Sequence, residues 1–154
     1  MIIEQIHSDH RAGREIFAVA GNSTFEASGE RADVFARLRD LWTAHGAMMS
    51  QVVYPELERA AGRPGAIDDA RGQQRVVEGI IADLARRAEA SNDQSLSQDP
   101  SLWFVDFERL KAEFERLCAM EADAIAPLLQ TRLDPDRLAH VTRAARELRL
   151  RHGV

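Results

Sequence analysis

The sequence has little cysteine, few aromatic residues and no long apolar run. Among its 154 residues Cys118 is the single cysteine, which excludes an intrachain disulfide and a zinc cluster built from several thiolates. Charges recur from Glu4 onward, so the N-terminal residues form neither a secretory leader nor a membrane span. We therefore expect a cytoplasmic protein in a reducing compartment.

Positive charge is also in deficit. Lysine and arginine number 20 against 25 aspartates and glutamates, which gives a formal net charge of -5. A nucleic-acid partner is not expected, because such proteins need a basic face to neutralise phosphates. The sequence contains no glycine-rich nucleotide loop and no Ser-His-Asp arrangement. We expect binding or sensing rather than turnover, with no catalytic residues.

The alternation of apolar and polar residues that marks a strand is missing as well, and helical periodicity replaces it. The predicted fold class is all-α: a single domain over residues 1–154, built as an antiparallel up-down four-helix bundle with a short C-terminal fifth helix. The polar segment 91–101 predicts a surface loop. The predicted helices are residues 3–20, a long helix that ends at the turn 62–65, residues 67–90, a helix from about Ser101, and a last helix from Asp134-Pro135.

Two of the predicted helices share a proline at a matching depth. Pro55 is the tenth residue after His45, and Pro127 is the tenth after Leu117. A proline inside a helix removes one backbone hydrogen bond and usually kinks the helix. The match predicts a pseudo-twofold bundle and gives a register for comparing its halves.

Three polar residues stand at inward positions of three helices, where leucine or isoleucine is the default. They are His10, His45 and Glu121. Burying such groups costs several kcal/mol unless they are paired or bind a cation. Two imidazoles and a carboxylate suit Fe(II), Mn(II) or Zn(II). The alternative is an ion pair between a histidine and Glu121 without any metal.

Four segments resemble a known family, the hemerythrin-like (HHE cation-binding) bundles. The resemblance covers nearly the whole chain and implies a four-helix bundle that holds two bridged irons between its helices. The segments are IHSDH, LWTAHGAMMSQVVYPEL, FERLKAEFERLCAMEADAIAPLL and the tail ELRLRHGV.

The chain departs from the family's pattern of metal ligands at several positions. Met49 and Ser50 stand where the family has carboxylates, and Leu117 stands where it has a histidine. The third helix has Val77 or Glu78 in place of its histidine. The second iron site has thereby lost its histidines, and a diiron centre that carries oxygen reversibly is not expected.

What the resemblance leaves is one cation held by His10, His45 and Glu121, with Glu78 as a further ligand whose orientation stays open. The expected cofactor is mononuclear iron or another divalent cation, and the expected role is binding, storage or sensing of a metal, oxygen, nitric oxide or redox state. Two alternatives stay open. One is a structural or interaction bundle without a metal, and the other is a mononuclear oxidase.

The remaining polar and aromatic residues have plainer interpretations. Cys118 and the aromatic residues predict core packing, and His7, His140 and His152 predict surface or fringe positions. The last helix predicts an apolar face and an opposite, solvated face of arginines, with an acidic partner or a homodimer contact as the alternative. Its apolar residues are Leu138, Val141, Ala145 and Leu148, and its arginines are Arg137, Arg143, Arg146, Arg149 and Arg151.

Overall fold

The structure is a computed structural model that describes the backbone of residues 1–20, 28–90 and 100–154. Side chains are described for residues 1–20, 33–87 and 105–154. The predicted helix end at Gly21-Asn22 and most of the predicted loop at 91–101 lie outside the described residues. Within the described residues the elements are all helical, which confirms the predicted fold class.

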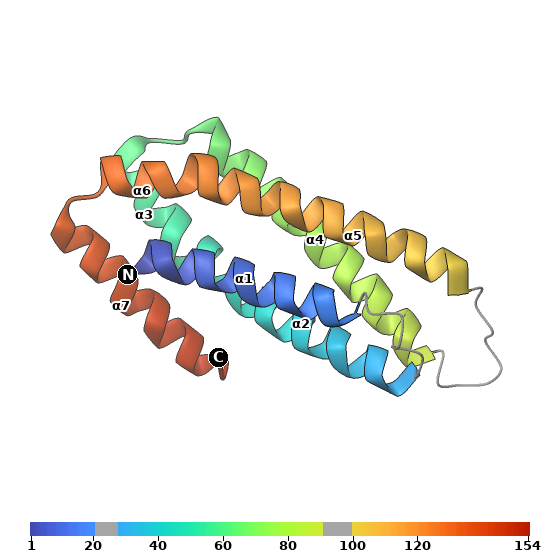
Figure 1. Cartoon of the computed structure of the whole chain (residues 1–154). Helices are drawn as coiled ribbons and strands as arrows, with labels where there is room; N and C mark the ends of the chain where they lie inside the picture. The colour runs from blue at the N-terminus through green and yellow to red at the C-terminus, as the bar shows by residue number, and fades with distance from the viewer. Residues whose placement is uncertain (21–27, 91–99) are drawn as a thin grey trace.

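Four long helical segments run side by side, up and down, and form the bundle (Figure 1). A last helix packs against the outside of the first two segments, near the N-terminus of the chain. In chain order the segments are α1 (Ile2–Ala20), α2 (Ser28–Met48) with its continuation through η1 (Met49–Val53) and α3 (Tyr54–Ala61), α4 (Gly65–Ala90), α5 (Pro100–Met120) with its continuation through η2 (Glu121–Ile125) and α6 (Ala126–Arg132), and finally α7 (Pro135–Arg151).

Two turns of π-helix, η1 and η2, interrupt the second and fourth segments at equivalent places. Pro55 is the second residue of α3 and Pro127 is the second residue of α6. A proline has no N–H to donate and its ring crowds the carbonyl four residues earlier, so the preceding turn widens. The distortion predicted at the two prolines therefore takes the form of a π turn. Glu121 begins η2 just as Met49 begins η1.

The core consists of two apolar clusters, one on each side of a polar layer. The first fills the half of the bundle that contains the ends of α1 and α4 and the start of α5, and it is rich in aromatic rings: Phe17, Phe35, Trp42, Phe107 and Phe114. The second fills the other half with aliphatic residues and methionines, among them Ile2, Ile6, Met48, Leu57 and Leu129. Between the two clusters lie His10, His45 and Glu121.

The last helix begins where the sequence predicts. Asp134 caps α7, because its side chain accepts a hydrogen bond of 2.8 Å from the backbone N–H of Arg137, and Pro135 fits the first helical position. Val141, Ala145 and Leu148 are buried, as predicted. The prediction that Arg149 belongs to the solvated face is wrong, since this side chain is buried.

Among the helices of the described residues, none is both long enough and apolar enough to cross a membrane.

Candidate metal site

The three predicted ligands come from three different helical segments and meet in the middle of the bundle. His10 lies on α1, His45 on α2 and Glu121 at the start of η2. Their relative exposures are 3%, 0% and 0%, so all three are buried. One ligand atom from each lies within 4.8 Å of the others. The structure thus brings together the set that the sequence predicts from polar residues on apolar stripes.

Glu121 is the centre of the cluster, because both imidazoles donate to it. His10 Nε2 donates to Oε1 at 2.7 Å. His45 Nε2 lies 2.8 Å from Oε1 and 3.1 Å from Oε2. One carboxylate from η2 therefore connects α1 and α2 across the core, and the Nε2 atoms of both imidazoles point at the same place.

Behind His45 lies a second buried carboxylate, Asp9, which the sequence reasoning missed. Asp9 accepts from His45 Nδ1 at 2.8 Å. It also forms a two-pronged ion pair with Arg149 of α7, with distances of 2.8 and 2.9 Å. A carboxylate on Nδ1 fixes the orientation of an imidazole and leaves Nε2 for a metal, as in many metal sites. Asp9 and Arg149 therefore hold the orientation of His45 through its Nδ1 atom.

Trp42 covers the other face of the site. Its ring stacks on His45 with centroids 4.3 Å apart and an angle of 17° between the planes. Phe114 packs against Trp42 at 4.7 Å between centroids. Aromatic packing of this kind excludes water from His45 and limits the rotation of its ring.

The two central groups shift each other's pKa in opposite directions. Burial is the largest influence on His45 and lowers its pKa, but the charge of Glu121 and the hydrogen bonds with Asp9 and Glu121 outweigh burial and raise the pKa from 6.5 to about 9. Burial is also the largest influence on Glu121. The charge of His45 and the hydrogen bonds from both histidines outweigh it and lower the pKa from 4.5 to about 2. At neutral pH His45 is therefore a cation beside an ionised Glu121.

The structure does not bring Glu78 into this cluster. Glu78 is an exposed residue of α4, and its carboxylate accepts a hydrogen bond of 2.8 Å from Gln74. Val77, the other position considered on this helix, is buried in the apolar core. The orientation that the sequence left open is thus away from the three ligands.

The apolar replacements predicted at the second site are buried side chains. Met49 begins η1 at the position that corresponds to Glu121 in the other half, and it is 1% exposed. Leu117 has no exposed surface. Among the described residues, His10, His45 and Glu121 form the one group of metal-ligating side chains with suitable spacing.

A groove of about 400 Å³ runs between α1 and α5, and His10 lines it. His7 also lines it, and its Nε2 atom is buried without a hydrogen-bond partner. Cys118 lies in the groove wall with a thiol pKa raised by burial, which agrees with the predicted role as a packed apolar residue. The groove gives solvent an approach to the His10 side of the cluster.

Fold and site together define a helical bundle protein with a buried site of two histidines and one carboxylate, the donor set of a divalent-cation site. The sequence model of the family described as Hemerythrin HHE cation binding domain matches residues 1–129. The chain belongs to this family, which confirms the resemblance found in the sequence. Comparisons with curated proteins and with solved structures gave no match.

Proposed function

We propose that this chain binds one divalent cation, iron in the cell, through His10, His45 and Glu121. The observation that carries the proposal is the convergence of three buried ligand groups on one point, with ligand atoms within 4.8 Å of each other. Two imidazoles and a carboxylate suit Fe(II), Mn(II) and Zn(II), and membership of a cation-binding family favours iron. The carboxylate of Asp9 supports the proposal, because it directs the free nitrogen of His45 toward the ion.

The proposed role is sensing or storage rather than turnover. A bound iron with three protein ligands would offer open coordination positions to oxygen, nitric oxide or water. The groove between α1 and α5 supports such a role, since it leads small ligands to His10. We also propose that the protein works in the cytoplasm, where its buried, free Cys118 stays reduced.

Metal loading tests the proposal. Protein incubated anaerobically with Fe(II), Mn(II) and Zn(II), then freed of excess metal, is expected to retain about one metal per chain when measured by mass spectrometry. His10→Ala and His45→Ala each remove a ligand and are expected to abolish retention. His140→Ala is the matched control, because His140 is an exposed histidine outside the cluster, and this variant keeps the metal.

An outcome without retained metal would favour a second function. The hydrogen bonds among His10, His45 and Glu121 satisfy all three buried groups without an ion. The chain would then be an interaction bundle that kept the family's fold and lost its cation. In that case the stabilities of the wild type and of His45→Ala would both be independent of added metal.

A further inference from the structure

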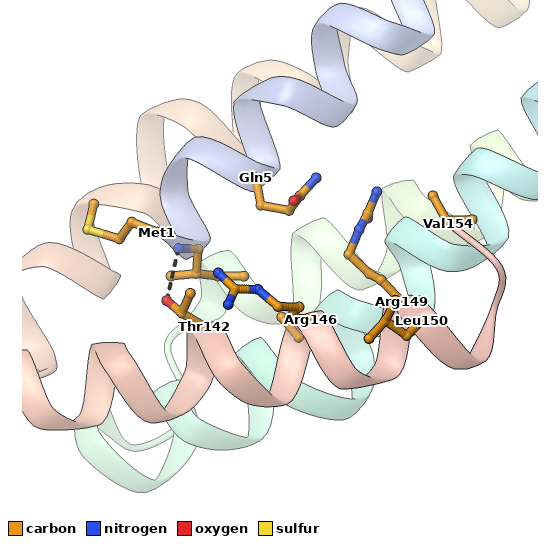
Figure 2. Close-up of a pocket in the computed structure, with 9 residues that line it drawn as sticks. Met1, Gln5, Thr142, Arg146, Arg149, Leu150 and Val154 are labelled. Carbon is orange, nitrogen blue, oxygen red and sulfur yellow. Dashed lines mark hydrogen bonds between the residues drawn. The ribbon is translucent and has the colours of Figure 1, made fainter.

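The helix α7 lies beyond residues 1–129, the part of the chain that matches the family, and yet it reaches the site. It packs along α1 and α2 on the outside of the bundle (Figure 1). Thr142 connects α7 to α1, because its hydroxyl oxygen accepts a hydrogen bond of 3.1 Å from the backbone N–H of Ile2. In Figure 2, Gln5 of α1 and Arg149 of α7 are directed into the space between the two helices.

Arg149 is the buried arginine of α7. It is 8% exposed, and both of its terminal nitrogens donate to Asp9, which is 2% exposed. Gln5 adds a third hydrogen bond to Asp9, at 3.1 Å. A guanidinium that binds both oxygens of a carboxylate fixes the plane of that carboxylate as well as its charge.

The remaining bond of Asp9 is the one to His45. The Oδ2 atom of Asp9 accepts from Arg149 and from His45 Nδ1, so a rotation of the carboxylate would break both contacts. Without Arg149, Asp9 and Glu121 would share the single positive charge of His45, and a buried carboxylate that has lost its guanidinium partner tends to rearrange. The orientation of His45 thus depends on a residue that touches neither His45 nor Glu121 within hydrogen-bonding distance.

We propose that Arg149 is a positioning residue of the metal site, which acts through Asp9 to hold His45 with Nδ1 protonated and Nε2 directed at the cation. This inference rests on the proposed function. It makes α7 part of the site, so that the affinity for the cation is coupled to the packing of α7 on the bundle. Removing the group that binds Nδ1 of a histidine ligand typically lowers the affinity for the metal roughly 10–100-fold.

A second arginine of α7 provides the matched control. Arg137 pairs with Glu56 of α3, a carboxylate that is 5% exposed, and this pair lies on the far side of η1 from His45. Removing either arginine takes a guanidinium from a buried carboxylate and weakens the attachment of α7, although Glu56 keeps Arg59 and Asp9 keeps Gln5 and His45. Only the loss of Arg149 disturbs the support of His45.

The test is a titration of the metal-free protein with Co(II), followed by its visible absorption. Arg149→Met is expected to weaken cobalt binding roughly 10–100-fold, and Arg149→Lys, which keeps the charge but not the two-pronged geometry, by less. Arg137→Met is expected to bind with wild-type affinity although its unfolding midpoint falls. The proposal would be overturned if a folded Arg149→Met or Arg149→Lys bound cobalt with wild-type affinity. It would also be overturned if Arg137→Met lost as much affinity as Arg149→Met.

A measurement without metal separates this inference from the proposed function. Nitrogen-15 NMR of the metal-free protein is expected to show the Nδ1–H proton of His45 as a downfield signal protected from exchange, and Arg149→Lys is expected to lose that protection. If the wild type bound no cobalt but this loss occurred, the proposed function would fail and the positioning of His45 by Arg149 would stand. Unchanged protection in Arg149→Lys would contradict the positioning role whether or not cobalt binds.

Discussion

Glu121 is the residue that joins the two histidines of the site. Its carboxylate accepts from both His10 and His45 and lies in a core without exposed surface. A carboxylate charge buried in this way is balanced by imidazole protons or by a cation. Protons and a divalent cation are therefore alternatives at the same place, and the protonation of His45 reports which of them is present.

Because imidazole protons balance the charge of Glu121 in the metal-free protein, the stability of that protein should depend on pH. The pKa of His45 is raised from 6.5 to about 9, so its stabilising contribution is complete below pH 6.5 and is lost as the pH rises through 9. The pKa of Glu121 is lowered from 4.5 to about 2, so its contribution is complete above pH 4.5 and is lost as the pH falls toward 2. Urea unfolding is expected to show greatest stability between these limits, with a loss on the order of 2–3 kcal/mol from pH 6.5 to pH 9.5.

Glu121→Gln is the control for this pH dependence. The variant removes the charge that raises the pKa of His45, so the decline above pH 6.5 should largely disappear although the protein is less stable overall. A wild-type stability that is flat or rises between pH 6.5 and pH 9.5 without metal would show that His45 is not the cation described above.

The cluster of His10, His45 and Glu121 could be predicted from the sequence because its members are polar residues at apolar positions. The supporting residues were harder to predict, although the same periodicity points at them. Asp9 lies three residues after the buried Ile6, and Arg149 lies four residues after the buried Ala145, so both positions belong to apolar stripes. An arginine is usually assigned to solvent, and only the packing of α7 against α1 reveals that this one meets a buried carboxylate.

At the scale of elements, the two π turns shape the bundle. The sequence predicts distorted helices at Pro55 and Pro127, but periodicity cannot tell a kink from a widened turn. The widened turn matters for the site, because Glu121 is the first residue of η2. In the other half of the bundle Met49 occupies the equivalent position, as the first residue of η1. Both halves therefore contain the π turn, but only the half with η2 has a carboxylate at this position.

The packing of the Phe114 ring of α5 against α1 depends on a glycine. A Cβ atom at Gly13 would lie 2.5 and 2.9 Å from two ring atoms of Phe114, a side chain of the aromatic core. We predict that Gly13→Ala destabilises the protein by about 1–3 kcal/mol in urea unfolding, because a rigid ring in a packed core has little room to move.

Gly79 is the matched control for this contact. It lies within α4, and a Cβ atom there would meet nothing within 4 Å. Gly79→Ala is expected to stabilise the protein by about 0.5–1 kcal/mol, since alanine is the better helix former. If Gly13→Ala were as stabilising as Gly79→Ala, the close contact of the Phe114 ring with Gly13 would be contradicted.

At the scale of the whole molecule, a polar layer lies between the two apolar clusters of the core. His10, His45, Glu121, Asp9 and Arg149 lie buried with an apolar cluster on each side. Replacing such a layer with aliphatic residues often stabilises a protein, so a bundle needs a reason to keep it. We take that reason to be the cation. That residues 1–154 form a single domain stays a prediction.

The most direct test of a single-cation site is the X-ray absorption spectrum of the protein loaded with Fe(II), recorded at the iron edge. We predict scattering from two imidazoles and from oxygen ligands, with no second iron at the distance of about 3.5–4 Å that is typical of two-metal sites. His45→Ala, which is expected to retain no metal, should give no such spectrum. Iron–iron scattering, or a spectrum without imidazole ligands, would contradict a mononuclear site at His10, His45 and Glu121.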